Sequence, residues 1–130
     1  AGMGKTILAQ LVFHDRRIEE QFEIKAWVYV SQSFDLVRLT RSILRSFQSS
    51  AADSKDLEIL QRQLRQRLTG KRYLLVLDDV WSKDGNMWEH LLLPFSGKSS
   101  QGKVIVTTRD MEVASIMGST QLLHLKQLQE

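Results

Sequence analysis

The chain has 130 residues, 42% of them hydrophobic and 25% charged, which fits one modest globular domain and excludes a disordered or fibrous protein. It carries 18 basic and 15 acidic side chains, and the net charge of +3 is too small to require a polyanionic partner. The absence of cysteine excludes disulfides, thiol catalysis and cysteine-ligated zinc, and no apolar run reaches the roughly 18 to 20 residues that span a bilayer.

Two hydrophobic periodicities alternate along the first half of the chain. Apolar residues at helical spacing predict a helix over 6–13, and the β-branched and aromatic run 24–30 predicts a strand. Further helical stripes predict helices over 36–47 and 57–68, the second of them ended by a C-cap at Gly70.

The second half continues the alternation with shorter elements. The continuous apolar run 73–77 is typical of a parallel strand covered on both faces, and a second such run, 104–106, extends into two threonines. A short helix over 111–117 and a strand over 122–125 follow. Strands and helices in this order predict a three-layer α/β domain with a parallel sheet.

Gly4-Lys5-Thr6 is the first candidate site. A phosphate-binding loop needs glycines so that backbone amides approach the anion, a lysine for the outer phosphates and a hydroxyl for magnesium, and then a helix whose N-terminus faces the phosphate. The helix predicted over 6–13 follows at once. The first glycine of the full pattern G-x-x-x-x-G-K-[ST] would precede Ala1, so the motif is truncated, and a surface turn explains the tripeptide alone equally well.

Asp78 and Asp79 follow a buried apolar run and form the second candidate site. Ligands collect at the carboxyl ends of parallel strands, where one carboxylate can hold a magnesium shell and a second can orient or activate water. A strand that ends in a solvated acidic turn is the simpler alternative. The separation from Lys5 leaves room for one extra strand and helix, the layout of P-loop ATPases with an added strand.

Arg109 ends the third motif, 104–109, in which a strand runs into two hydroxyls and an arginine. An arginine at a strand tip beside a γ-phosphate can sense that phosphate through a charge-assisted hydrogen bond. In isolation, a solvent-facing arginine would be the simpler interpretation. The interpretation as a sensor depends on the other two motifs.

Taken together, these motifs resemble the nucleotide-binding subdomain of plant NBS-LRR disease-resistance proteins, the NB-ARC module of the STAND ATPases. Residues 2–6 look like its P-loop, and 22–32 is similar to the motif that follows in the non-TIR branch. The stretch 74–81 (LLVLDDVW) resembles the kinase-2 motif, and the tryptophan at its end is the usual mark of the coiled-coil class. Residues 103–110 (KVIVTTRD) resemble the next motif, and 125–128 begins to resemble the one after it.

The resemblance covers residues 1–130 as one partial NB-ARC subdomain, from a truncated P-loop to the start of the region after the sensor arginine. It implies a three-layer P-loop NTPase fold with a parallel sheet, of the added-strand class, in which the strand before the P-loop is missing. In the family's sheet that strand lies between the strand 104–106 and the last strand. We therefore expect 122–125 to be unpaired from 104–106 or shifted to fill the gap, and the chain alone to be unstable or aggregation-prone.

The resemblance also implies the contacts of the phosphate loop. Backbone amides around Gly2, Met3, Gly4 and Lys5 would cradle the β-phosphate, with the Lys5 ammonium also on the phosphates. Ile7 belongs to the same nucleotide-binding set, but it stands where the family usually has a second threonine whose hydroxyl often touches the α-phosphate. Its loss weakens binding by about 1 kcal/mol, the value of one neutral hydrogen bond.

The remaining implied positions concern the metal and the outer phosphate. The hydroxyl of Thr6 and the carboxylate of Asp78 would hold Mg²⁺, Asp78 through water. Asp79 would be the catalytic carboxylate, and Arg109 would sense the γ-phosphate.

The function implied is a molecular switch in plant defence that holds ADP at rest, exchanges it for ATP and is reset by slow ATP hydrolysis. The expected partners are nucleotide and the other domains of an intact cytoplasmic receptor: the coiled coil, the ARC subdomains and the leucine-rich repeats. The chain alone is expected to be inactive as an ATPase. Two alternatives stay open: a general ATPase of the same class with rapid turnover, and a non-catalytic fragment of a truncated transcript or pseudogene that binds no nucleotide.

Other features have simpler interpretations. Residues 38–72 hold nine basic and three acidic side chains, but most of these fall on the polar faces of two amphipathic helices, so no nucleic-acid partner is predicted. Trp27 is expected to pack within its strand. Trp81 and Trp88 flank the loop after the two aspartates and are expected to pack under it, with contact to a partner domain as the second alternative. Met111 and Met117 are expected to face the core from a short helix.

Overall fold

The computed structural model describes residues 13–30, 35–47, 54–95, 101–117 and 122–124. The predicted strands and the helices over 36–47, 57–68 and 111–117 are confirmed to within two residues, whereas the helix predicted over 6–13 lies almost entirely outside the described residues. In chain order the elements are α2 (Arg16–Gln21), β1 (Ile24–Tyr29), α3 (Leu36–Phe47), α4 (Leu57–Leu68), β2 (Tyr73–Asp78), α5 (Gly85–Leu92), the 3₁₀ helix η1 (Leu93–Phe95), β3 (Lys103–Val106), α6 (Met111–Met117) and β4 (Leu122–His124).

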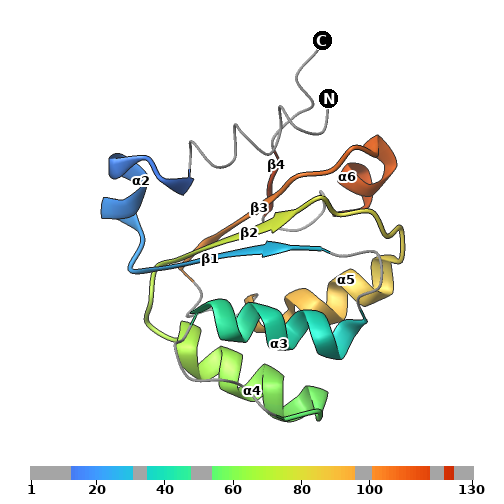
Figure 1. Ribbon diagram of the computed structural model, residues 1–130, viewed down its shortest axis with the longest axis horizontal. Helices are drawn as coiled ribbons and strands as arrows, with labels where there is room; N and C mark the ends of the chain where they lie inside the picture. The colour runs from blue at the N-terminus through green and yellow to red at the C-terminus, as the bar shows by residue number, and fades with distance from the viewer. Residues whose placement is uncertain (1–12, 31–34, 48–53, 96–100, 118–121, 125–130) are drawn as a thin grey trace.

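The strands form one parallel sheet in the order β1-β2-β3-β4 (Figure 1). Tyr29 pairs with Asp78 and Leu77 pairs with Val106, so β1, β2 and β3 end side by side. We call this side of the sheet the carboxyl edge, and the side where Ile24, Tyr73 and Lys103 begin the strands the amino edge. Loops that follow β1, β2 and β3 are thereby brought together at one edge.

β4 pairs directly with β3, with Val104 opposite Leu122 and Val106 opposite His124. Of the two placements expected for the last strand, unpaired or shifted beside 104–106, the structure has the second. Parallel pairing gives the backbone of β3 a ladder partner on each side.

The core lies on both faces of β2, whose six residues are all buried. Leu75 and Leu77 face the larger hydrophobic cluster, which α3, α4 and α5 build beneath the sheet (Figure 1). Leu74 and Val76 point to the opposite face, where Trp27 packs against them. Because a strand covered on both faces needs no polar side, its sequence is a continuous apolar run, and the predicted packing of Trp27 is confirmed.

Helix α4 shows how short signals set an element's ends. The Asp56 carboxylate accepts hydrogen bonds from the amides of Glu58 and Ile59, so it is the N-cap. The helix ends at the C-cap Thr69, and Gly70 follows with φ of +72°, in the left-handed region that glycine adopts without steric strain. The stop predicted at Gly70 is confirmed.

Helix α5 confirms that Trp88 packs against the loop after the two aspartates, whereas Trp81 is 40% exposed. Its N-cap is Asp84, whose carboxylate accepts from the amide of Met87 at 3.2 Å. Trp88 lies inside the helix, is only 2% exposed, and donates from its indole Nε1 to the carbonyl of Ser82 at 2.7 Å. The apolar residues of this helix occupy one side of barely two turns, too short a stretch for periodicity alone to reveal.

Met111 corrects a prediction from the sequence, because its side chain is 65% exposed rather than packed in the core. Val113, two residues later, is fully buried. Two helical positions differ by about 200° around the helix axis, so Met111 and Val113 face opposite ways. The side chain of Met117 lies outside the described part of the chain.

Across the described ranges, no helix combines the length and apolar character needed to cross a bilayer.

Candidate functional site

The tips of β2 and β3 form the candidate site at the carboxyl edge. The amide of Thr107 donates to the carbonyl of Leu77 at 3.0 Å, and the amide of Val80 donates back to the carbonyl of Thr107 at 2.8 Å. The tip of β1 is tied in as well, since the amide of Val30 donates to the carbonyl of Asp78 at 2.9 Å. Backbone hydrogen bonds therefore hold three chain-distant loops at fixed positions.

Asp78 ends β2 and is only 6% exposed. Its Oδ1 accepts a hydrogen bond of 2.7 Å from the hydroxyl of Thr107. A carboxylate removed from water needs such donors to offset its lost hydration. The site therefore contains a buried, oriented carboxylate at the end of its central strand.

Asp79 has φ of +66°, the left-handed region that residues other than glycine seldom adopt. Its amide donates to the hydroxyl of Thr107 at 2.8 Å. Its side chain is 26% exposed, in contrast to that of Asp78. The turn at Asp79 therefore leaves the two neighbouring acids in different environments, one buried and one near the surface.

Arg109 forms a two-point ion pair with Asp79. Its Nε lies 3.2 Å from Oδ1 and its Nη2 lies 3.0 Å from Oδ2. This side-on contact raises the pKa of the Arg109 guanidinium, first through the hydrogen bonds that it donates to Asp79 and then through charge attraction. The arginine side chain is 65% exposed, so solvent screens the charge attraction between Arg109 and Asp79. Because the guanidinium is already in water, it can leave Asp79 for another partner without being moved out of a buried environment.

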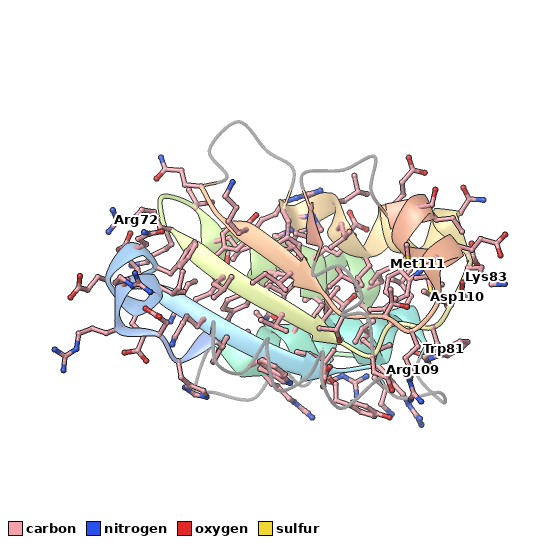
Figure 2. All side chains as sticks on the ribbon, turned by 90° about the horizontal axis from the view of Figure 1, so that it is seen from above. Arg72, Trp81, Lys83, Arg109, Asp110 and Met111 are labelled. Atoms are coloured by element: carbon pink, nitrogen blue, oxygen red, sulfur yellow. The ribbon has the colours of Figure 1, made fainter. Side chains whose placement is uncertain are left out.

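A second charge cluster lies beside this pair. Lys83 Nζ is 2.8 Å from Glu112 Oε2 and 3.5 Å from Asp110 Oδ2, and the hydrogen bond to Glu112 is the main reason its pKa is raised. Asp110 also caps α6, because its Oδ1 accepts from the amide of Glu112 at 2.9 Å, and this bond chiefly lowers the Asp110 pKa. Figure 2 shows Lys83, Arg109 and Asp110 together at one end of the molecule, with Arg72 at the other.

The structure thus brings together Asp78, Asp79 and Arg109, three of the residues that the sequence predicts for the site. The predicted phosphate loop is outside the described residues: Gly2, Met3, Gly4, Lys5, Thr6 and Ile7. Within the described part, no group of three or more histidine or acidic side chains is arranged to hold a metal ion. The buried Asp78 carboxylate nevertheless offers the hard oxygen atoms that suit Mg²⁺.

Sequence reasoning missed two members of this site. Thr107 was seen only as a hydroxyl at the end of a strand, although that position beside Arg109 was a usable signal. No sequence pattern indicated Lys83, because its two acidic partners lie more than 25 residues away along the chain.

A large hollow lies at the amino edge instead. It encloses about 560 Å³ and is lined by residues that include Phe22, Arg72 and Lys103. None of the residues predicted for the site borders it. The chemistry of the described residues is therefore concentrated at the other edge.

A parallel sheet with helices beneath it, and with carboxylates and an arginine at its strand tips, defines an α/β nucleotide-binding domain of the P-loop NTPase class. The NB-ARC domain family matches residues 1–130, and the chain belongs to that family of nucleotide-binding domains.

The names of similar proteins agree with the assignment of the chain to the NB-ARC family. The chain is 44% identical over 130 residues to "Disease resistance protein RGA2" of Solanum bulbocastanum, which aligns with 99% of this chain. It is 42% identical over 127 residues to "Putative disease resistance protein RGA4" of the same species, and 46% identical over 115 residues to "Disease resistance RPP13-like protein 4" of Arabidopsis thaliana. These alignments cover 98% and 87% of the chain, and the chain spans 13% of the length of each of the three relatives.

Proposed function

We propose that this chain is the nucleotide-controlled switch element of a plant disease-resistance receptor of the coiled-coil class. It would hold ADP at rest, exchange it for ATP on activation, and return to rest by slow hydrolysis. Membership of the NB-ARC family supports the nucleotide, and the names of the relatives support the receptor. The observation that carries the proposal is the convergence of Asp78, Asp79 and Arg109 at one edge of the sheet.

Asp78 and the hydroxyl of Thr6 would hold Mg²⁺, with Asp78 acting through water. The hydrogen bond that Asp78 accepts from Thr107 at this buried position supports an oriented carboxyl group there. Bound Mg²⁺ would neutralise charge on the phosphate oxygens. The backbone amides of Gly2, Met3 and Gly4, together with Lys5, would bind the phosphates themselves.

Arg109 would report the γ-phosphate, and its pairing with Asp79 supports a competitive mechanism. The guanidinium contacts the Asp79 carboxylate at two points. A planar guanidinium binds phosphate oxygens with the same geometry, so ATP would draw Arg109 away from Asp79. The carboxylate released in this way would accept a proton from the attacking water.

Lys5→Ala in the full-length protein tests the proposal directly. We expect loss of measurable ADP and ATP binding, because the lysine ammonium no longer offsets the charge of the phosphates. Isothermal titration calorimetry gives the affinity, and chromatography of the heat-released nucleotide shows what the purified protein carries. Lys83→Ala is the control, since it removes another lysine, one that pairs with Asp110 and Glu112.

Normal ADP affinity in Lys5→Ala would show that the loop is assigned wrongly. The same preparations separate the alternative functions. Rapid steady-state ATP turnover by the unsubstituted protein would favour a general ATPase over a switch. Protein that neither carries nucleotide after purification nor binds added ADP would favour a non-catalytic fragment.

A further inference from the structure

We propose that Thr107 is a positioning residue of the nucleotide site, in which one buried hydroxyl orients the carboxylate of Asp78 and holds the backbone of Asp79. The inference rests on the proposed function, because it concerns how the magnesium-binding carboxylate is set in place. Thr107 lies outside the phosphate loop and the acidic pair and is distinct from the sensor arginine, so the inference adds a residue to that site.

The directions of the two hydrogen bonds follow from what each group can do. The Asp79 amide can only donate, and an ionised Asp78 carboxylate can only accept. The hydroxyl of Thr107 has one proton and two lone pairs, so it accepts from Asp79 at 2.8 Å and donates to Asp78 Oδ1 at 2.7 Å. The result is a short chain of aligned hydrogen bonds in which each bond polarises the next.

Thr107 itself has little freedom to move. Thr107 is only 2% exposed. Its amide donates to the carbonyl of Leu77 and its carbonyl accepts from the amide of Val80, both in the chain segment around the tip of β2. The branched side chain also restricts rotation about χ1. A hydroxyl fixed from both directions determines the rotation of the Asp78 carboxylate about its last bond, and with it the position of both oxygens.

The same hydroxyl explains how the chain tolerates the turn at Asp79. A left-handed φ of +66° is unfavourable for a residue with a side chain and persists where surrounding contacts stabilise it. The hydrogen bond from the Asp79 amide to Thr107 is such a contact. By stabilising the turn, Thr107 keeps Asp78 buried while Asp79 reaches the surface and pairs with Arg109.

Thr108 provides the contrast that separates positioning from plain packing. It is also buried, at 9% exposure, and its hydroxyl donates to the carbonyl of Val80 at 2.6 Å. It accepts from the amide of Asp110 at 3.1 Å, so its described bonds stabilise the same loops. None of these bonds involves Asp78 or Asp79, and Thr108→Val is therefore the matched control for Thr107→Val.

The experiment measures ADP affinity of the full-length protein by calorimetry, once with excess Mg²⁺ and once with EDTA. The ratio of the two affinities reports how much Mg²⁺ strengthens binding. We expect Thr107→Val to lower this ratio about tenfold, because a buried carboxylate loses the donor that orients it. Thr107→Ser keeps the hydroxyl and should restore the ratio to within about twofold, and Thr108→Val should leave it unchanged even where it lowers the melting temperature.

Two outcomes would overturn the inference: an unchanged ratio in Thr107→Val, or a loss in Thr107→Ser as large as in Thr107→Val. If the valine variant does not fold, Thr107→Cys replaces it, with a weak thiol donor and an expected intermediate loss; an unchanged ratio there is equally contradictory. Asp78→Asn separates the two levels of the proposal. A ratio unchanged in Asp78→Asn refutes the magnesium assignment itself, whereas a ratio lowered in Asp78→Asn and unchanged in the threonine variants refutes only the positioning by Thr107.

Discussion

The two edges of the sheet differ in what holds them together. At the carboxyl edge, the loops are joined by hydrogen bonds and ion pairs among Asp78, Asp79, Thr107 and Arg109. At the amino edge, hydrogen bonds and an ion pair between Glu23 and Arg72 are joined by the aromatic packing of Tyr73 against Phe95. The hollow lined by Phe22, Arg72 and Lys103 lies at this amino edge and borders no residue of the acidic and basic cluster. The converging polar groups at the strand ends therefore mark the candidate site, and this hollow does not.

Tyr73 illustrates the amino edge. Its ring is buried, stacks edge-on against Phe95 at 5.3 Å between ring centres, and its hydroxyl donates to the carbonyl of Phe95 at 3.1 Å. Gly102 lies directly against this ring, with no room for a side chain. Changes at this edge should alter stability, whereas changes at the carboxyl edge should alter nucleotide chemistry.

The largest expected effect is on hydrolysis and comes from Asp79→Asn. Asparagine also tolerates a left-handed backbone, so the turn should survive while the proton acceptor is lost. We expect ATP hydrolysis by the full-length protein to fall about a hundredfold or more, with ADP affinity nearly unchanged. Phosphate release under single-turnover conditions measures the rate, and Glu112→Gln is the control because it removes a nearby carboxylate outside the Asp79–Arg109 pair. If ATP hydrolysis by Asp79→Asn stays within about threefold of the rate of the unsubstituted protein, the assignment of nucleotide chemistry to the carboxyl edge is contradicted.

Gly102→Ala is the opposite case, with an effect on stability alone. A Cβ at this position would overlap the buried ring of Tyr73, so the ring or the start of β3 must shift. Overpacking of this kind typically destabilises by about 1–3 kcal/mol. Urea unfolding measures the change, and Gly70→Ala offers a control at a glycine with open space but a left-handed φ. A loss of ADP affinity at a temperature where Gly102→Ala is folded would show that the two edges are coupled.

The smallest expected effect is a difference in pH dependence between the edges. The pKa of Asp110 is held below its ordinary value of 3.8, chiefly by the amide of Glu112 and then by Lys83. Because the folded pKa is the lower one, the stabilisation is present above pH about 4 and is lost as the pH falls through the folded value. Asp110→Asn keeps a capping side chain but removes the charge, so its melting temperature should be slightly lower near neutral pH and should converge with that of the unsubstituted protein once the pH falls below the folded pKa of Asp110. The deficit of Gly102→Ala should stay constant over that range; a convergence there would contradict the packing explanation.

Much of the fold was readable from local patterns. The six buried residues of β2 form a continuous apolar run, and the helices α3 and α4 have stripes long enough to fix their period. The same patterns placed Asp78 and Arg109 at strand ends. Helices α2 and α5, which the structure caps with Asp15 and Asp84, were not predicted, because six and eight residues are too few for a periodic signal.

The pairing at the site was decided by tertiary structure. Asp79 and Arg109 are thirty residues apart in the chain, and their contact depends on the register that sets Leu77 opposite Val106. The same register brings the Thr107 hydroxyl within reach of both acids, and the short helix α6 turns Met111 outward while Val113 packs inward. A sequence determines which residues end a strand, because burial and periodicity act locally. Which of those ends meet is decided when the backbone ladder between strands forms, since that ladder joins segments that no local pattern connects.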